Sequence, residues 1–517
     1  MFKKIKRFAA LVAAVTLIAS FDAKPMLTKA SSFSDDFTTD ITIVGENTDL
    51  NTPIVGGAEE TYQPMDRIWQ GCPNIIVTQK RIWAAWYTGG PTEPHQRNYC
   101  VIAYSEDGGK TWVDPYMIID PAVESESTVL PLFFLYENEL WIIYFHYKTT
   151  NSGTYAIKSS NFDADDINDV TWSEPAYLFA RMIHHRPTVL SDGSLVVGAQ
   201  GSDKTITNVY KSTNKGITWF QSGTAASDLN SYHKAKIVQK KDGSLWMLSQ
   251  LERGTGGGMQ QSFSYDGGYT WTRYEYDLDP PLISPGARFE ITRLISGNLA
   301  LVSYATTNSR TDLTIYLSED DGATWKHSIL LDSRTEVSYP DLAQDEQGNI
   351  YVIWDMGRYE QKEIRMSIMT EQDIKNGKLA FEKEMIVISK LSDYKDIVGA
   401  SGLDRTITVK KGTLSKDIIQ NLPSPLTVID EDGKAYQLNG RWVSKGYKAD
   451  VEGKYVFTFL PEGLGLLQDV HNLLKVEIIV KAEKSGANVW LIVGIAAAVV
   501  VLAGAGLSAL LIKRKRG

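Results

Sequence analysis

The chain has 517 residues, of which 43% are hydrophobic, 53 are Lys or Arg and 62 are Asp or Glu. The apolar fraction excludes a chain that is disordered throughout. A formal net charge of −9 excludes the excess of basic residues that nucleic-acid binding requires. Only 2 Cys are present, which excludes a disulfide scaffold or a cysteine-based metal framework, while 13 Trp and 25 Tyr are typical of aromatic-rich β structure.

Residues 1–30 are predicted to be a signal peptide. A cluster of basic residues between Lys3 and Arg7 is followed by the apolar run AALVAAVTLIAS. A basic stretch before an apolar run of about a dozen residues is typical of secretory signals. The chain is therefore expected to be exported.

Two repeated patterns occupy residues 50–400. The motif Ser-x-Asp-x-Gly-x-Thr-Trp appears as SEDGGKTW, STNKGITW, SYDGGYTW and SEDDGATW, and Trp172 marks a degenerate copy. A series of tight turns, each feeding an apolar strand, is marked by Ile82, Leu140, Leu195, Leu245, Leu299 and Ile350. A repeat of roughly 40–50 residues or more, holding several short strands, is typical of a β-propeller. The sequence therefore predicts an all-β six-bladed propeller, in which each motif is a structural turn at the outer edge of a blade.

Residues 401–482 have a different sequence pattern from the repeats before them. Short alternating strands separated by Gly turns, as in GYKADVEGKYVFTF, favour a small immunoglobulin-like β-sandwich. Residues 483–488 are then a linker. We expect the sandwich to act as a spacer between the propeller and a membrane.

Residues 489–512 are predicted to be one C-terminal transmembrane helix. They carry no charge, and at about 1.5 Å per residue they would span a hydrocarbon core of roughly 30 Å. The basic tail at residues 513–517 is expected to stay cytoplasmic. The predicted location is therefore the outer side of the cell membrane, with the propeller outside.

The repeated motif resembles the Asp box of the sialidase (neuraminidase) superfamily, and four boxes on six blades resemble a bacterial exo-sialidase. The resemblance covers about 350 residues. It implies a retaining glycoside hydrolase that uses Tyr as nucleophile, because the carboxylate of sialic acid would repel a carboxylate nucleophile. It also implies Arg side chains that bind the substrate carboxylate and an acid of raised pKa that protonates the leaving oxygen.

Matching the family element by element assigns five residues. The segment SYPDLAQDEQGNIYVIWD implies Tyr339 as the nucleophile and Asp355 as the carboxylate that orients an Arg. The segment SRTDLTIYLSEDDG implies Arg310 as one member of the Arg clamp. DRIWQGCP places Arg67 at the first Arg of the family, oriented by Asp355, and Glu93 in the loop GGPTEPHQRNY is the expected acid.

The middle of the family pattern is not matched. The Glu that activates the Tyr would fall near His233 or Lys234, and the second Arg would fall on Gln250. His233 is therefore a candidate base, and Arg253 or Arg288 is a candidate for the second guanidinium.

The segment HHRPT at residues 184–188 opens the third blade. His184, His185 and Arg186 are either substrate contacts or polar residues at the start of a strand. Cys72 and Cys100 fall in one blade, where either a disulfide or two free thiols would be compatible with export. No metal-ligand spacing is found, and no cofactor is expected.

Three functions remain open at this stage. The first is a cell-surface exo-sialidase acting on sialylated glycans. The second is a related propeller that cleaves another acidic glycan, as a uronate- or rhamnose-type hydrolase or by lyase chemistry with a His or Tyr base. The third is a glycan-binding adhesin without catalysis.

Overall fold

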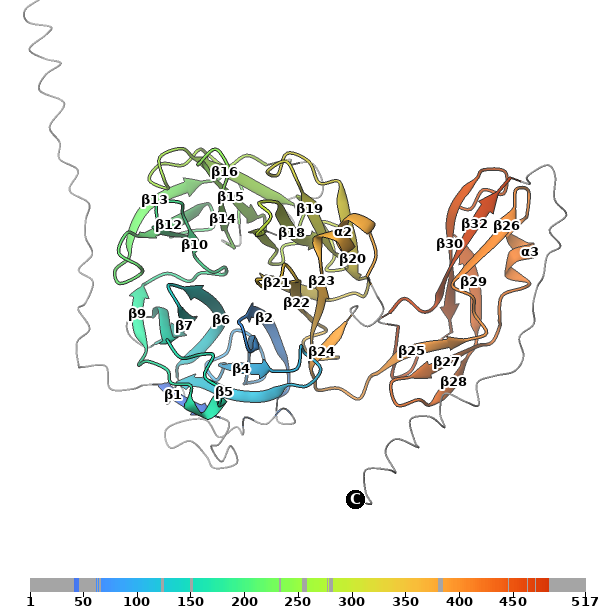
Figure 1. Cartoon of the computed structure of the whole chain (residues 1–517), viewed down its shortest axis with the longest axis horizontal. Helices are drawn as coiled ribbons and strands as arrows, with labels where there is room; N and C mark the ends of the chain where they lie inside the picture. Colours follow the sequence, from blue (N-terminus) through green and yellow to red (C-terminus); the bar gives the residue numbers. More distant parts are fainter. Residues whose placement is uncertain are drawn as a thin grey trace, which may run out of the picture. The chain divides into compact units, whose positions relative to one another are not determined.

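The computed structural model describes residues 41–45, 62, 64, 67–121, 125–148, 152–231, 234–252, 258–276, 278, 282–379, 385–444, 446–462, 464–469 and 471–482 (Figure 1). These residues form two compact units that divide between Leu391 and Ser392. The predicted signal peptide and transmembrane segment lie outside the described residues. No helix within the described residues is long and apolar enough to cross a membrane.

The first unit is a ring of six antiparallel sheets, in agreement with the predicted propeller (Figure 1). The innermost strands of the sheets are β2 (Gln70–Val77), β6 (Ser127–Tyr136), β10 (Thr188–Val189), β14 (Lys236–Gln239), β17 (Glu290–Arg293) and β21 (Val337–Gln344). Strand β2 contacts both β6 and β21, so the first and last sheets close the ring.

Each sheet adds its strands outward in chain order. The remaining strands are β3 (Ile82–Thr88), β4 (Tyr99–Ser105), β5 (Val113–Pro121), β7 (Glu139–Tyr147), β8 (Gly153–Ser159), β9 (Ala176–Phe179), β11 (Leu195–Gln200), β12 (Ile206–Ser212), β13 (Phe220–Ala226), β15 (Leu245–Gln250), β16 (Met259–Ser264), β18 (Leu299–Tyr304), β19 (Leu313–Ser318), β20 (His327–Asp332), β22 (Ile350–Met356), β23 (Glu363–Met369) and β24 (Ile386–Lys390). Strand β1 (Ile41–Gly45) pairs with β5 as a fifth strand of the first sheet.

The repeated apolar strands form the core between neighbouring sheets. Gly243 and Gly297 adopt positive φ in the turns that lead to β15 and β18, a conformation that favours Gly. Leu245 and Leu299, which mark the repeated apolar strands after these turns, are fully buried. Trp83 from the first sheet packs in one cluster with Phe133 from the second. Apolar contact between sheets therefore stabilises the ring as a whole.

The Asp boxes form the turns after the third strand of their sheets. In the first box, Ser105 and Asp107 are joined by a hydrogen bond of 2.9 Å, and Ser105 Oγ accepts from Gly109 N at 2.9 Å. Asp107 also accepts from the backbone N and the hydroxyl of Thr111 at 2.9 and 2.7 Å, and Trp112 Nε1 donates to Gly109 O. Ser, Asp or Asn, and Gly make equivalent bonds in the other three boxes. The motif is therefore a self-contained turn.

The box glycines also pack one sheet against the preceding one. A Cβ on Gly216 would lie 2.4 Å from the Trp141 ring, and a Cβ on Gly322 would lie 2.7 Å from the Trp246 ring. The degenerate copy retains part of the pattern, because Asn161 accepts from the backbone N of Thr171 at 3.0 Å. In the sixth sheet, helix α2 (Glu371–Asn376) takes the place of the box.

The second unit consists of two four-stranded sheets. One contains β25 (Lys395–Ser401), β27 (Leu426–Asp430), β28 (Ala435–Leu438) and β31 (Leu467–Gln468), and the other contains β26 (Thr406–Lys410), β29 (Gly440–Ser444), β30 (Gly453–Pro461) and β32 (Lys475–Lys481). Helix α3 (Ser415–Ile419) lies between β26 and β27. A core that includes Val428 and Phe457 draws on both sheets, as in a sandwich. Because β25 pairs with β27, the unit begins before residue 401, the predicted start.

Candidate active site

Tyr339 lies in an irregular part of β21. The pairing of β21 with β22 shifts between Ser338 and Asp341, and Tyr339 has a φ of 51°. The Tyr339 N–H donates to the Tyr304 hydroxyl at 3.2 Å. A register shift of this kind is a β-bulge. β-Bulges change the direction of side chains and are common beside active sites. The side chain is only partly buried, so it remains accessible within the propeller.

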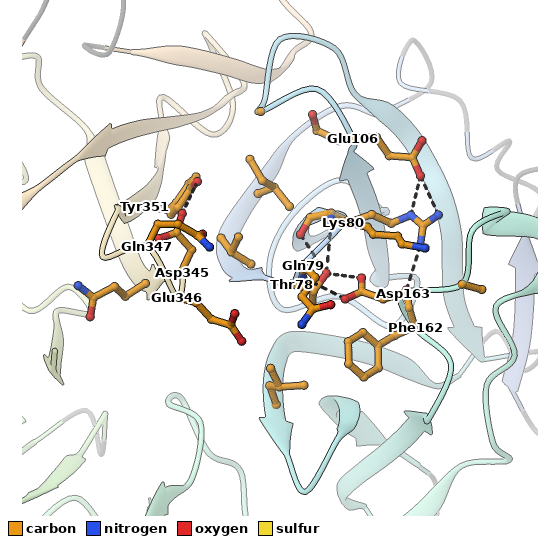
Figure 2. A pocket seen from close by; sticks show the side chains of 18 of the residues that line it. Thr78, Gln79, Lys80, Glu106, Phe162, Asp163, Asp345, Glu346, Gln347 and Tyr351 are labelled. Carbon is orange, nitrogen blue, oxygen red and sulfur yellow. Dashed lines mark hydrogen bonds and ion pairs between the residues drawn. The ribbon is translucent and has the colours of Figure 1, made fainter. Parts of the chain in front are cut away.

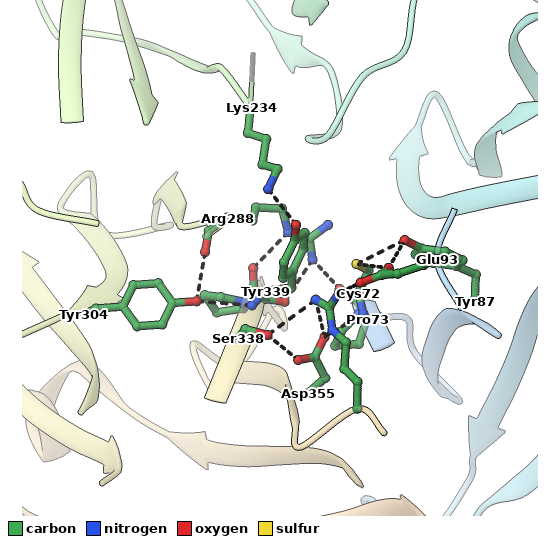
Figure 3. Close-up of polar contacts among 12 residues, drawn as sticks. Cys72, Pro73, Tyr87, Glu93, Lys234, Arg288, Tyr304, Ser338, Tyr339 and Asp355 are labelled. Carbon is green, nitrogen blue, oxygen red and sulfur yellow. Dashed lines mark hydrogen bonds and ion pairs between the residues drawn. The ribbon is translucent and has the colours of Figure 1, made fainter. Parts of the chain in front are cut away.

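Four basic side chains lie close to the Tyr339 side chain, and Figure 3 shows two of them, Lys234 and Arg288, beside it. Lys234 Nζ donates to the Tyr339 hydroxyl at 2.6 Å. The guanidinium carbons of Arg358, Arg310 and Arg288 lie 4.1, 5.5 and 5.8 Å from the centre of its ring. This concentration of positive charge favours an anionic ligand at the hydroxyl.

Arg358 is held by two carboxylates. Its Nε and Nη2 contact Asp355 Oδ2 at 3.0 and 2.9 Å, and its Nη1 donates to Glu93. Asp355 is itself fixed, because it accepts from Cys72 N at 2.7 Å and from the Ser338 hydroxyl at 2.5 Å. Since Arg358 and Asp355 are buried and the part-exposed Glu93 binds the other side of the guanidinium, the group is pre-oriented beside Tyr339.

Glu93 is a carboxylate that supports Arg358. Burial disfavours its ionised form, but Arg358 and the donating hydroxyl of Tyr87 hold the pKa of Glu93 below its usual value. A general acid that protonates a leaving oxygen needs a raised pKa. The structure thus brings Glu93 to the site predicted for it, but in an ionisation state opposite to the one that role requires.

Arg288 and Arg310 differ in what they offer a ligand. Arg288 is 1% exposed and donates to the backbone oxygens of Pro73, His184, Tyr339 and Pro340. Its donors are therefore engaged in holding inner strands together. Arg310 is more exposed, and its buried Nε has no hydrogen-bond partner among the described residues. Arg310 is the better candidate for a ligand contact.

Arg67 is not part of this cluster, so its predicted position is wrong. Its Nη1 contacts Asp114 at 2.7 Å, and its Nη2 donates to Tyr62 O at 3.1 Å. Asp114 belongs to β5 and also accepts from Ser389 in β24, so Arg67 lies between the outer strands of the first and sixth sheets. The partner of Asp355 is Arg358 rather than Arg67.

Gly71 explains why Arg358, and not an Arg of the first sheet, is the partner of Asp355. Gly71 stands two residues before Pro73, which is the spacing of Arg in the Arg-Ile-Pro element of the family. A Cβ on Gly71 would lie 2.6 Å from Arg358 Nε. The space of the missing side chain is thus occupied by a guanidinium from the sixth sheet. The signal that we missed was a Gly where a close approach of another group is required.

Lys234 is the second residue that sequence matching did not assign. In the orientation that satisfies its amide, Gln250 accepts from Lys234 Nζ at 3.2 Å and donates to Ala287 O at 2.7 Å. Gln250 therefore positions the ammonium group that touches Tyr339. An amine, not a carboxylate, lies at the Tyr339 hydroxyl. The candidates His233 and Arg253 lie outside the described residues.

The candidates at the start of the third sheet are engaged elsewhere. His185 Nδ1 lies 2.9 Å from Glu290 Oε2, and burial lowers the pKa of His185 to about 4. Lys236 contacts the other oxygen of Glu290 at 2.9 Å, and Arg186 binds Asp341. Lys236 and Arg186 thus form ion pairs with carboxylates of inner strands, and His185 hydrogen-bonds to one of these carboxylates. Cys72 and Cys100 are free buried thiols.

A ring of six sheets with Asp-box turns, and with basic side chains gathered around Tyr339, defines a sialidase-like propeller. Residues 80–352 match the BNR repeat-like domain, and the chain belongs to this family. It is a member of the sialidase-like BNR-repeat superfamily that the motif predicted. Comparison with curated protein sequences gave no match.

Solved structures with a similar fold include sialidases. The Hadza microbial sialidase Hz136 is 19% identical, with 61% of this chain and 68% of that chain covered and a TM-score of 0.50. The intramolecular trans-sialidase from Ruminococcus gnavus is 14% identical, with 62% and 98% covered and a TM-score of 0.47. The Trypanosoma rangeli sialidase is 14% identical, with 62% and 57% covered and a TM-score of 0.44. At these identities the likeness concerns the fold.

Proposed function

We propose that the chain is a glycoside hydrolase that releases a terminal acidic sugar, in the manner of an exo-α-sialidase. The observation that carries the proposal is the Tyr339 side chain, whose hydroxyl contacts Lys234 and whose ring lies close to Arg288, Arg310 and Arg358. A phenol is a suitable nucleophile where the substrate carries a carboxylate at the reacting carbon. The guanidinium groups supply the counter-charge for that carboxylate.

In this mechanism the sugar carboxylate binds Arg310 and Arg358. The Tyr339 hydroxyl loses its proton to solvent water, and its oxygen attacks the anomeric carbon to form a glycosyl–Tyr bond. The bond to the leaving oxygen breaks, and that oxygen takes a proton from water. Lys234 holds the phenol oxygen and stabilises the negative charge on it. Water then attacks the same carbon and releases the sugar with retained configuration. Glu93 and Asp355 act by positioning Arg358.

A second candidate is β-elimination at a uronate. It is favoured by two observations: the Tyr339 hydroxyl contacts an amine, and the ionised Glu93 is unsuited to protonate a leaving group. In this reaction the Tyr339 phenolate removes the proton next to the carboxylate, and Arg310 and Arg358 stabilise the resulting enolate. The electron pair then expels the glycosidic oxygen, which leaves an unsaturated sugar without consuming water.

One experiment separates these functions. The chain and its Tyr339→Phe variant are incubated with a fluorogenic α-sialoside and, separately, with polyuronates. Release of sialic acid that the variant loses supports the hydrolase. Unsaturated product, detected by ultraviolet absorbance, supports the lyase. Saturable glycan binding with neither product would contradict both and support a glycan-binding role.

We further propose that the chain acts outside the cell, held in the membrane by residues 489–512. The support is the basic and apolar pattern of residues 1–30 and the uncharged run before the basic tail. Cell fractionation tests this proposal. The full chain is expected in the membrane fraction, and a chain truncated after residue 488 is expected in the medium. Recovery of both chains from the cytoplasm would contradict it.

A further inference from the structure

A cavity of about 510 Å³ lies along the inner strands of the third, fourth and fifth sheets, from Lys236 at the start of β14 to Lys241 in the turn after it. It is formed by residues of β10, β14 and β17 and by the turns that follow β10 and β14. Lys234 precedes β14 and contacts Tyr339, whereas Lys240 follows β14 and lines the cavity. Six residues of extended chain span about 20 Å, so the part of the cavity formed by Lys240 and Lys241 is remote from the Tyr339 hydroxyl.

The described charged residues that line this cavity are all basic. Its described lining residues include Arg186, Lys236, Lys240, Lys241 and Arg293, and none of its described lining residues is acidic. Apolar groups such as Val189 and Ile291 complete the wall. A concave site of this size with several convergent charges is typical of a small-ligand site.

Three of these cations are paired with carboxylates that are not among the described lining residues. Arg186 pairs with Asp341, Lys236 pairs with Glu290, and Arg293 pairs with Asp321. Five cations therefore face three anions, which leaves a local excess of positive charge in a chain whose net charge is −9. The pairs also fix the inner cations in place, so a ligand would meet a pre-organised surface.

The larger cavity of the propeller lacks this property. Its volume is about 970 Å³, and it lies between the turns after β2, β6 and β21 (Figure 2). Arg81 pairs there with Glu106, and Lys80 pairs with Asp165. Asp163 accepts from Thr78 and Gln79. Because its lining holds acids, such as Glu106 and Asp345, as well as the paired Lys80 and Arg81, this larger cavity does not present charge of one sign.

We infer that the smaller cavity is a second glycan site, specific for an anionic sugar unit that carries a carboxylate or a sulfate. Guanidinium and ammonium groups bind both anions by charge-assisted hydrogen bonds. A volume of about 510 Å³ lies within the range of ligand pockets for sugar-sized molecules. The site would hold a second acidic unit of a glycan independently of turnover at Tyr339.

The test measures binding to the full chain carrying Tyr339→Phe and Arg358→Ala, so that the first site contributes little. Isothermal titration calorimetry at low salt is performed with sodium sulfate, with sulfated lactose, with a uronate-bearing disaccharide and with unmodified lactose. We expect saturable binding of the anionic probes and none of lactose. The sulfate and uronate arms show which anion the site prefers.

The deciding variant is Lys240→Glu together with Lys241→Glu, two residues in the turn after β14. The matched control is Lys410→Glu together with Lys411→Glu, an exposed adjacent pair in the second unit that changes the net charge equally. The deciding variant should weaken binding by about tenfold or more, and the control should change it by less than about twofold.

Three results would overturn the inference: no saturable binding of any anionic probe, equal binding by the deciding variant, or an equal loss in the control. Because turnover is absent from this assay, none of these results bears on the function proposed for Tyr339.

Discussion

The Asp-box turns and the Tyr339 site lie at opposite ends of the same blade strands, yet they are built in different ways. The boxes repeat one set of local hydrogen bonds after β4, β12, β16 and β19. The Tyr339 site uses residues that occur once each, from loops of several sheets. The comparison teaches that repeated segments maintain the ring while unrepeated segments supply chemistry, so substitutions should damage one without the other.

The largest effect is expected from Arg358→Ala. Loss of a pre-oriented guanidinium should lower kcat/KM by about 10²–10³-fold, since such donors act mainly on the developing charge. Thermal unfolding serves as the check that the ring persists. Adding Gly71→Arg to this variant should recover part of the activity, because the new side chain would enter the space that Arg358 leaves. Full activity of Arg358→Ala would remove Arg358 from the site.

Arg67→Leu should lower stability and leave activity nearly unchanged, the reverse of Arg358→Ala. Removing one partner of the Arg67–Asp114 pair leaves a largely buried carboxylate and should lower the free energy of unfolding by about 3 kcal/mol. The kcat/KM of the folded fraction should stay within about twofold. Urea unfolding and steady-state kinetics measure the two effects. A large kinetic loss at unchanged stability would restore Arg67 as a site residue.

Lys234→Met should reduce kcat by about 10²-fold with little change in KM, if the ammonium acts on the phenol oxygen during reaction. The variant keeps the length of the aliphatic stem, which limits its effect on packing. Lys240→Met, at the other end of β14, serves as a matched control and should leave kcat unchanged. A rise in KM alone would instead indicate a role in substrate binding.

Asp266→Asn in the third box should lower the free energy of unfolding by about 1–2 kcal/mol, because Asp266 accepts from the backbone and hydroxyl of Thr270 at 2.9 and 2.6 Å. Turnover should be unchanged. Calorimetric unfolding detects the first effect, and the kinetic assay tests the second. Loss of activity in a stable variant would contradict the separation of the two ends.

The smallest effect concerns pH. The backbone N–H and hydroxyl of Thr111 lower the pKa of Asp107 to about 2, and the hydroxyl and backbone N–H of Thr324 lower the pKa of Asp320 to about 2. These pKa values lie below that of an unfolded Asp, near 3.9. Their contribution to stability is therefore present above about pH 4 and is lost as pH falls toward 2. Urea midpoints should fall over this window, and less so for Asp107→Asn with Asp320→Asn.

The fold was predictable because its signals are local. Turn glycines and the apolar runs after them mark six sheets, and each Asp box closes its own bonds within eight residues. The start of the second unit was less predictable, because β25 belongs there through pairing with β27 and not through its own sequence.

The site was predictable only in part. Tyr339, Asp355 and Arg310 are held near their expected places by β21, β22 and the loop before β19. Arg358 was missed because a long side chain can supply a guanidinium from a different sheet, whereas sequence matching follows backbone positions. Lys234 was missed because an amine replaces the carboxylate that the resemblance leads one to expect.

The backbone at Tyr339 has a consequence for how this chain could change over generations. A φ of 51° is a left-handed conformation that costs about 1–2 kcal/mol for a residue other than Gly. A descendant relieved of its chemical task would gain stability by exchanging Tyr339 for Gly or Asn. A phenol retained there would mark a lineage still under selection for catalysis, whereas Gly at that place would mark a blade kept for its shape alone.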